Sequence, residues 1–306
     1  MKPKAILSER DEDLLMFLWR WKLATTRNLA LAFYAGKSFR AAYIRLWRLE
    51  RAGWLSSFTA PNGRDHFWTL TDSAFTQIVR PKLSGLIQNG YKSEAMDHDF
   101  LVNAIHLGKW VMGMPENVSL FTEQELRRLD PELYPEWVPQ SQIHRPDGYT
   151  LIADGQESRF MAIEVELSQK KLEIYENVAR FYFEDTRVTD VVWVVERQAQ
   201  ARSIKSRIDA TIGNQRPNHS FILLDDLRKH HWLATIGLGN HNGLTFENVI
   251  GIRPENRRNH DSKIAFFDTR KSLRESSKTI NSKARVLVNR EALLASSQKI
   301  KKEYSK

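Results

Sequence analysis

Hydrophobic residues recur at helical spacing through the first fifty residues of the chain. Residues 9–22 place leucines and a tryptophan on one face, and Ser8 is positioned to cap the N-terminus ahead of an acidic first turn. A second helix is expected over residues 25–34. A third is expected over residues 39–52, with Ser38 as its N-cap. The pattern therefore predicts three short helices in succession.

After the third predicted helix the hydrophobic period changes from 3.6 to 2. Residues 54–59 and 66–70 alternate as strands do, and Asn62-Gly63 between them is a strong hairpin-turn signal because both residues tolerate positive φ. Arg64 would stand at the tip of this hairpin. Three helices followed by a hairpin with a basic tip predict a winged helix-turn-helix domain over residues 1–80.

The third predicted helix and the hairpin carry the residues expected to contact double-stranded DNA. Ala42, Leu46 and Leu49 form the inward stripe of the helix, and arginines with aromatic residues occupy its other faces. Arginines can bind phosphates while the first turn enters the major groove. The expected DNA-binding residues are Ser38, Arg40, Tyr43, Arg45, Trp47, Arg48, Arg51 and Arg64. The alternative is a winged helix that binds a protein partner.

The patterned chain that follows predicts a second domain over residues 91–250. Its expected elements are helices over residues 91–112, 123–130, 168–184 and 199–212 and strands over residues 149–153, 160–167, 191–195 and 221–224. This order is typical of an α/β (α+β) domain with a small mixed sheet.

Three carboxylates of this second domain are expected to meet at one edge of the sheet. Glu164 and Glu166 point to the same face of one strand, because strand side chains alternate. Asp147 stands at the end of the neighbouring strand. Converging carboxylates repel one another and are costly to bury unless a cation joins them. Mg²⁺ or Mn²⁺ is the expected cofactor, since such hard cations prefer oxygen ligands and can activate water beside a phosphate.

Length and composition limit the class of protein. The chain has 306 residues, enough for two domains with their own cores, and it contains no cysteine, which excludes disulfides and cysteine-ligated zinc. Its apolar runs are far shorter than the ~20 residues that span a bilayer, and its first residues are charged. These features predict a cytoplasmic protein with no membrane partner.

The net charge of +9 is unevenly distributed along the chain. Residues 1–80 carry 13 Lys and Arg against 7 Asp and Glu, residues 81–253 carry 19 against 24, and residues 254–306 carry 14 against 6. Basic ends around an acidic centre are consistent with DNA contacts at the ends and a cation-binding centre. Residues 254–306 lose apolar periodicity and are expected to form a basic, partly flexible tail on the phosphate backbone, with a solubilising tail as the alternative.

The Asp147 turn and the Glu164-Val165-Glu166 strand together resemble the core of the PD-(D/E)XK nucleases. In that family a Pro-Asp-Gly turn and a following hairpin bring the metal ligands together. The resemblance implies that Asp147 and Glu164 bind the metal, with the carbonyl of Val165 as a third ligand. The general pattern has lysine where this chain has Glu166, and that lysine steers water or stabilises developing negative charge.

Lys170 is expected to replace the missing motif lysine, with Lys171 next to it. If neither side chain reaches the site, the domain would bind metal without cutting DNA. An ordinary ion pair between Glu166 and Lys170 is the structural alternative.

More narrowly, the chain resembles the plasmid replication–relaxation family over about residues 8–225. That family pairs a winged helix with such a core and is similar to the mobilisation relaxases. The likeness depends on the order of the nuclease-like turn, the upstream helix with Glu123 and Glu125, and the run from His144 to Asp147. It implies that Glu123 or Glu125 is an upstream site carboxylate and that His144 supports the metal ligands.

Other titratable residues have a structural interpretation that we favour. His98 and His106 match no strong metal-ligand spacing, so hydrogen bonds within the fold are expected of them. Tyr175 and Tyr182 stand two turns apart on a predicted helix. A nucleophilic tyrosine is one interpretation of that spacing, and packing under the sheet is the favoured one.

The function expected from these features is a metal-dependent DNA nickase or endonuclease of a mobile genetic element. One alternative is a sequence-specific DNA-binding regulator or replication accessory factor with an inactive nuclease-like domain. A second is an adaptor whose winged helix binds another protein. A homodimer and DNA-processing proteins of the mobile element remain open as partners.

Overall fold

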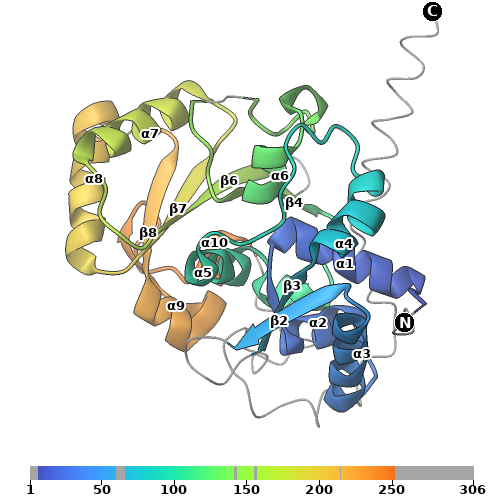
Figure 1. Ribbon diagram of the computed structural model, residues 1–306. Coiled ribbons are helices and arrows are strands. Elements are labelled where there is room, and N and C mark those ends of the chain that lie inside the picture. The colour runs from blue at the N-terminus through green and yellow to red at the C-terminus, as the bar shows by residue number, and fades with distance from the viewer. Residues whose placement is uncertain (1–5, 60–65, 141–142, 155–156, 214, 252–306) are drawn as a thin grey trace, which may run out of the picture.

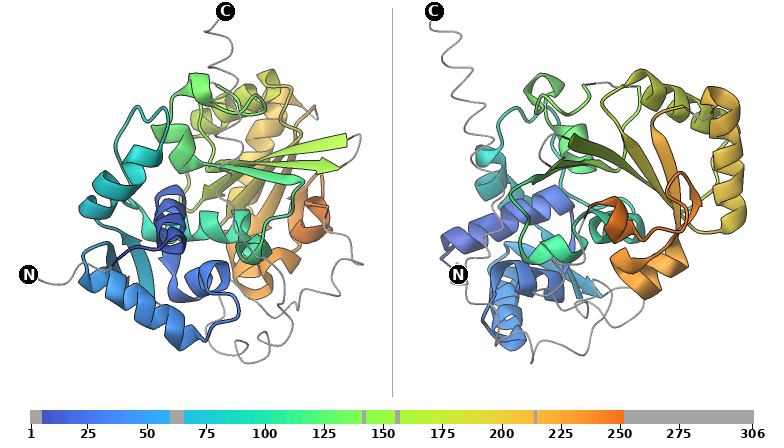
Figure 2. Two further views of the ribbon diagram at one scale, coloured as in Figure 1. Left: turned by 90° about the vertical axis from the view of Figure 1, so that its right-hand side faces the viewer. Right: turned by 180° about the vertical axis from the view of Figure 1, so that it is seen from behind.

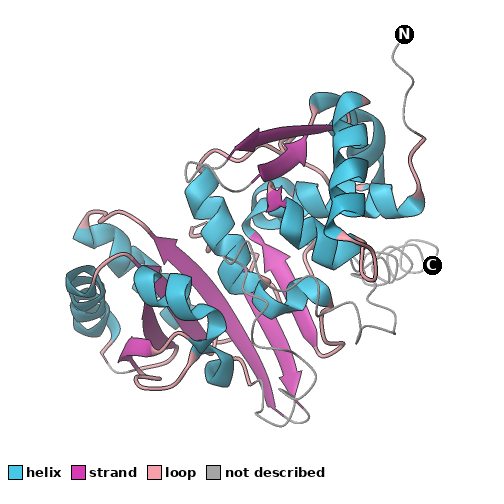
Figure 3. Ribbon diagram, turned by 90° about the horizontal axis from the view of Figure 1, so that it is seen from below, coloured by secondary structure: helices cyan, strands magenta, loops and turns pink. Residues whose placement is uncertain are grey.

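The computed structural model describes residues 6–59, 66–140, 143–154, 157–213 and 215–251, and it contains two sheets (Figure 1). A three-stranded sheet has the order β1-β3-β2, and a six-stranded sheet has the order β4-β5-β6-β7-β8-β9. Figure 3 shows the small sheet set apart from the long strands of the larger one. The predicted turn at Asn62-Gly63, its Arg64 and the basic tail lie outside the described residues.

The N-terminal part follows the predicted order of three helices and a hairpin. Its helices are α1 (Glu9–Trp21), α2 (Thr26–Phe33) and α3 (Phe39–Arg51), and its strands are β1 (Ala24–Thr25), β2 (Leu55–Thr59) and β3 (His66–Leu70). Ser8 caps α1 as predicted, in a capping box with Asp11. Ser38 caps α3 through a hydrogen bond that its side chain accepts from the backbone of Ala41. The three predicted helices and both hairpin strands are confirmed.

A short helical stretch connects this part to the rest of the chain. It runs through α4 (Asp72–Ala74), a π-helical turn (Phe75–Val79) and a 3-10 turn (Arg80–Lys82). Phe75 and Val79 are buried against the N-terminal part, and no such helix was predicted here from the sequence.

The larger sheet is mixed, as the hydrophobic pattern predicted. Its strands are β4 (Val118–Thr122), β5 (Gly148–Asp154), β6 (Glu157–Glu166), β7 (Asp190–Val195), β8 (Asn218–Leu223) and β9 (Ile236–Gly239). Strands β4, β5 and β6 pair antiparallel, β6, β7 and β8 pair parallel, and β9 returns antiparallel. Helices α7 (Leu172–Glu184) and α8 (Gln198–Ile212) connect the parallel strands.

Helices cover both faces of this sheet (Figures 1 and 2). On one side lie α7 and α8, and on the other lie α5 (Met96–His106), α9 (Leu224–His230) and α10 (Phe246–Val249). Every residue of β7 is buried as a result, which explains its almost wholly apolar sequence. Helix α6 (Glu123–Arg128) follows β4 directly and is capped by Thr122, as predicted.

Two predicted helices are shorter than expected. The helix predicted over residues 91–112 begins at Met96 and gives way after His106 to a 3-10 turn (Gly108–Met112). Gly108 causes the break: its φ is +40°, and a Cβ there would meet the Trp232 ring at 2.0 Å. The helix predicted over residues 168–184 begins only at Leu172, because Lys171 has extended backbone angles.

Strands β4 and β9 were not predicted, nor were α9 and α10. Both strands lie at edges of the sheet, where one flank of hydrogen bonds is enough to hold a short segment. β9 contains two glycines in four residues, which conceals its strand character in a hydrophobicity pattern.

One cluster of buried apolar side chains extends from α1 to α10, so the N-terminal part packs directly against the larger sheet. Hydrogen bonds reinforce this contact. The Trp19 indole donates to the carbonyl of Gly90, and the Asn103 side chain in α5 donates to the carbonyls of Trp21 and Leu23. Within the described ranges, none of the helices has the length and apolar character needed to cross a membrane.

Candidate functional site

Asp147, Glu164 and Glu166 lie together at the carboxyl end of β6. The backbone N–H of Asp147 donates to the carbonyl of Ile163 at 3.0 Å, and its carboxylate accepts from the N–H of Val165 at 2.6 Å. These two bonds hold the aspartate alongside β6. Glu164 and Glu166 are both buried on that strand, at 8% and 4% exposure. The structure thus brings the three predicted carboxylates to one place.

The three carboxylates influence one another electrostatically. Burial, together with the charges of Glu164 and Glu123, raises the pKa of Asp147 in spite of a hydrogen bond from His98. Burial also raises the pKa of Glu166, and the charges of Glu164 and Asp147 add to that rise while Lys170 opposes it. Negative charge at this position is therefore costly, and a nearby cation lowers the cost.

His98, from the first turn of α5, lies between two of the predicted metal ligands. Its Nε2 is 3.3 Å from a carboxylate oxygen of Asp147 and 3.2 Å from the carbonyl oxygen of Val165. Burial by itself lowers the pKa of His98, but the neighbouring carboxylates of Asp147 and Asp99 together outweigh burial and raise the pKa to about 10. His98 is therefore an imidazolium that donates to both oxygens at neutral pH.

Glu164 has two partners on the face of the sheet covered by α7. His144 Nε2 lies 2.6 Å from one carboxylate oxygen, and the Tyr182 hydroxyl donates to the same oxygen. Burial is the largest single influence on His144 and lowers its pKa, but the charge and hydrogen bond of Glu164 and the charge of Asp147 together outweigh burial and raise the pKa. Burial and the Glu164 charge raise the pKa of Tyr182 well above its usual value. Tyr182 is thus a neutral hydrogen-bond donor that orients Glu164, which does not favour its use as a nucleophile.

Lys170 pairs with Glu166 at 2.9 Å. Its side chain is half exposed, and its backbone lies in the loop before α7, so the helical turn expected to connect it to Glu166 is absent. The N–H of Lys170 donates to the hydroxyl of Tyr175, which fixes the loop. Burial lowers the pKa of Lys170, but Glu166, Glu164 and Asp147 outweigh burial and raise it. The ammonium is therefore charged and sits within the field of all three carboxylates.

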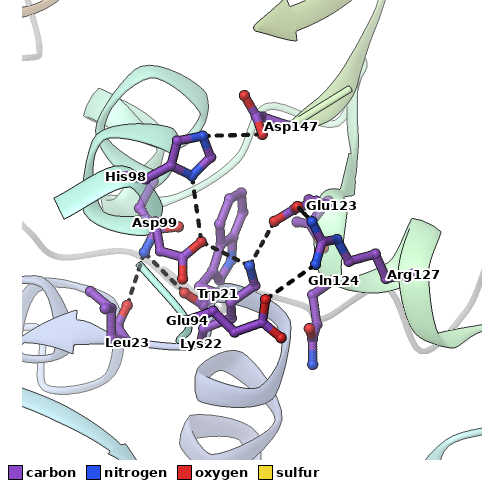
Figure 4. A network of polar contacts seen from close by, with 12 residues as sticks. Trp21, Lys22, Leu23, Glu94, His98, Asp99, Glu123, Gln124, Arg127 and Asp147 are labelled. Atoms are coloured by element: carbon purple, nitrogen blue, oxygen red, sulfur yellow. Dashed lines mark hydrogen bonds and ion pairs between the residues drawn. The ribbon is translucent and has the colours of Figure 1, made fainter. Parts of the chain in front are cut away.

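A second group of charges adjoins the first and joins the two parts of the protein (Figure 4). Lys22, directly after α1, places its ammonium 2.8 Å from Asp99 and 2.6 Å from Glu123. Arg127 also pairs with Glu123, at 2.7 Å. The side chains of Lys22, Asp99 and Glu123 are 6–12% exposed, so this pairing lies in a largely dry environment.

The structure distinguishes the two candidate carboxylates of α6. Glu123 is close enough to Asp147 for its charge to raise the pKa of Asp147. Glu125 instead completes the capping box with Thr122 and pairs with Arg20 at 2.9 Å. Glu123 therefore belongs to the site, and Glu125 stabilises the start of α6.

The donor atoms at the end of β6 fit a divalent cation in their chemistry. Asp147, Glu164 and the Val165 carbonyl offer the oxygen donors that Mg²⁺ and Mn²⁺ prefer. In the described part of the chain, however, no group of three or more His, Asp or Glu side chains is spaced to hold a metal ion. The His98 imidazolium lies where two of these donors would share a cation. A cation bound by both donors would compete with His98 for Asp147.

The residues predicted to bind DNA take different positions on α3. Of the predicted residues, those exposed are Ser38, Arg40, Tyr43, Trp47, Arg48 and Arg51; Ala42, Leu46 and Leu49 are buried as expected. Arg45 is engaged within the fold, because its guanidinium forms two hydrogen bonds to the fully buried carboxylate of Asp11. Arg45 therefore holds α3 against α1, whereas Arg40 and Arg48 face solvent.

Arg45 and Arg40 are expected to respond differently to replacement by methionine. Arg45→Met should lower the free energy of unfolding by about 2 kcal/mol, because it leaves the buried Asp11 carboxylate without its cation. Arg40→Met should leave stability within about 0.5 kcal/mol and weaken DNA binding with a shallower salt dependence. Urea unfolding and salt-dependent DNA binding measure the two effects. Equal stability of the two variants would contradict the assignment.

The pKa of His98 predicts how stability depends on pH in metal-free buffer. The pKa of His98 is higher in the folded state than in the unfolded chain, where it is about 6.5. The protonated imidazole therefore stabilises the fold fully below about pH 6.5, and this contribution is lost as the pH rises towards about 10. The difference in unfolding free energy between wild type and His98→Gln should shrink over this range. Urea titrations at several pH values measure it. A difference that stays constant from pH 6 to about 10 would contradict the assignment.

Sequence reasoning underestimated His98 and missed Lys22 and Asp99. The run Asp97-His98-Asp99 is visible in the sequence, but its partners Asp147 and Val165 are distant along the chain and only the fold brings them close. Lys22 gave no signal, because a lysine after a helix is ordinarily solvated.

No protein-family model matches the chain, and neither a curated protein nor a solved structure matches it. The functional conclusion therefore depends on the geometry of the described residues.

Proposed function

We propose that the protein binds double-stranded DNA through its N-terminal part and cleaves it in a reaction that requires Mg²⁺ or Mn²⁺. The observation that carries the proposal is the meeting of Asp147, Glu164 and Glu166 at the carboxyl end of β6, beside the charged Lys170. Burying several carboxylates together is electrostatically unfavourable, and a divalent cation that acts on a phosphodiester would offset this repulsion.

The arrangement of elements supports this proposal. Three antiparallel strands, a helix and a parallel strand follow in the order β4-β5-β6-α7-β7, with the short helix α6 between β4 and β5. The Pro-Asp-Gly turn lies beside the Glu-Val-Glu strand β6. This order supports a PD-(D/E)XK-like core. Three helices with a basic outer face, followed by a hairpin, support a winged helix-turn-helix. The resemblance to plasmid replication–relaxation proteins suggests DNA of a mobile genetic element as the substrate.

Each residue of the site has a distinct task in this proposal. Asp147, Glu164 and the Val165 carbonyl would hold the divalent cation, which supplies Lewis-acid activation of phosphate and water. Tyr182 and His144 orient the Glu164 carboxylate through the oxygen that they share.

The remaining charged residues act on the phosphate and on the balance of charge. Lys170 presents a half-exposed ammonium that can bind a phosphate oxygen, which is the task of the lysine absent at Glu166. Lys22 neutralises Glu123 and Asp99, so that fewer negative charges oppose the approach of DNA. His98 holds a proton beside Asp147 and thereby offsets its negative charge.

A plasmid relaxation assay tests the proposal. Supercoiled plasmid incubated with the full chain in Mg²⁺ or Mn²⁺ should be converted to open circles or linear DNA, and EDTA should prevent the conversion. Plasmid that stays supercoiled with both metals, while gel shifts show that it is bound, would contradict the proposed cleavage.

A DNA-binding regulator or replication accessory factor that does not cleave is the second candidate function. The observation in its favour is that the site carboxylates already have partners within the protein: His98 for Asp147, His144 for Glu164 and Lys170 for Glu166. A site neutralised in this way can be structural. DNA binding that is indifferent both to metal and to Asp147→Ala would favour this function.

A further inference from the structure

The outer face of α3 combines large apolar side chains with arginines. Phe39, Tyr43, Ile44 and Trp47 are each 38–42% exposed, an unusual proportion for four large hydrophobic residues on one helix of 13 residues. Nothing in the described part of the chain covers them further. The outer face of α3 is therefore a candidate interaction surface, and its side chains indicate the kind of partner that it binds.

The aromatic side chains form a row along the helix. Phe39, Tyr43 and Trp47 are four residues apart, so at 100° per residue they follow one another with a drift of about 40° per step. Tyr43 also packs edge-on against Trp68 of β3, with ring centroids 6.2 Å apart, which anchors the middle of the row. The flat side chains of Phe39 and Trp47 remain at its two ends.

Arginines flank this aromatic row. Arg40 and Arg48 are exposed, and the Arg51 guanidinium lies 4.7 Å from the centroid of the Trp47 ring. The one acidic residue of the helix, Glu50, is occupied by hydrogen bonds from Ser57. The surface thus offers positive charge and flat rings with no competing carboxylate on the helix itself.

This combination fits unpaired nucleotides better than the edges of paired bases. Base edges in the major groove are recognised by patterns of hydrogen-bond donors and acceptors; a phenylalanine ring can offer them only apolar contact, and a tryptophan adds a single N–H donor. Aromatic rings stack instead on the exposed faces of unpaired bases, while arginines hold the phosphates between them.

We propose that the Phe39–Trp47 face of α3 binds DNA in which bases are unpaired, such as a locally opened duplex. The inference rests on the proposed DNA binding and specifies the form of DNA that this helix prefers. A protein partner fits the surface less well, because three arginines call for a polyanion. The chain's own residues 254–306 carry 14 Lys and Arg against 6 Asp and Glu, so their charge does not complement the surface either.

Binding of the full chain to three labelled DNAs tests the inference. The probes have the same length and sequence and are a duplex, a single strand and a duplex with a central bubble of unpaired bases. Fluorescence anisotropy is measured in EDTA so that nothing is cleaved. The variants are Trp47→Leu and Phe39→Leu, with Phe183→Leu on α7 as the control because its exposure of 43% matches theirs. Thermal unfolding of each variant verifies that it is folded.

The wild type is expected to bind the bubble and the single strand more tightly than the duplex. Trp47→Leu and Phe39→Leu should each weaken binding of the bubble about 10-fold, the loss expected for one base stack, and change duplex binding less than about 2-fold. Phe183→Leu should bind all three DNAs like the wild type.

Three results would overturn the inference. Preference for the duplex, or an equal loss on all three DNAs in Trp47→Leu, would leave DNA binding in place and remove the role of unpaired bases. Unchanged affinities in both aromatic variants would show that the aromatic row takes no part in DNA binding. No binding of any DNA would instead overturn the proposed function itself.

Discussion

Asp147→Asn and Glu164→Gln should each lower the rate of DNA cleavage by at least about 100-fold while DNA binding persists. Both substitutions keep the shape of the side chain and remove its charge. The amide oxygen introduced by Asp147→Asn can still accept from the N–H of Val165, so the turn before β5 is retained. Replacing a residue that only supports a metal ligand typically lowers activity 10–100-fold. Replacing the ligand itself should lower the cleavage rate further. Plasmid relaxation in Mg²⁺ measures the rate.

A matched control separates this effect from a general loss of negative charge. Glu173 is an exposed carboxylate in the first turn of α7, close in sequence to the site and outside it. Glu173→Gln should cleave plasmid like the wild type. Wild-type rates in both Asp147→Asn and Glu164→Gln would show that cleavage, if observed, occurs elsewhere on the protein.

Lys22→Met should lower the free energy of unfolding by about 3 kcal/mol or more. The substitution removes the cation that Asp99 and Glu123 share in a largely dry environment. Removing one partner of a buried pair typically costs 3–5 kcal/mol, and the lower end is expected here because Arg127 stays beside Glu123 and His98 beside Asp99. Methionine retains the length of the side chain and its packing. The melting temperature should fall by roughly 6–12 °C for a chain of this size.

The control for this prediction is an exposed lysine of the same N-terminal part. Lys37, between α2 and α3, is exposed, and Lys37→Met should melt within about 1 °C of the wild type. Equal melting temperatures of Lys22→Met and Lys37→Met would show that the ion pairs of Lys22 with the two carboxylates do not contribute to the free energy of unfolding.

Local signals in the sequence were sufficient for most of the fold. Caps at Ser8, Ser38 and Thr122 mark three helix starts, and the alternation of residues around Glu164 identifies β6 and the face its carboxylates share. Such signals are reliable because each depends on neighbours within one turn or one strand. The helix breaks at Gly108 and Lys171 were not predicted, since the first depends on the distant Trp232 ring.

Only part of the candidate site could be predicted from the sequence. Its carboxylates could be grouped because a hairpin joins them, whereas their cations come from elsewhere in the chain. His98 is 49 residues before Asp147, and Lys22 is separated from Glu123 by 101 residues. Pairing across such distances is decided by tertiary packing, so only the structure shows which of these side chains pair with the carboxylates.

A calorimetric titration of the full chain with Mn²⁺ tests the central claim most directly. The account predicts one site per chain in the wild type, displacement of the bound Mn²⁺ by excess Mg²⁺, and loss of binding in Asp147→Asn and Glu164→Gln, with Glu173→Gln unchanged. Wild-type binding that persists in both site variants, or no binding at all, would contradict the claim that this carboxylate group holds a divalent cation.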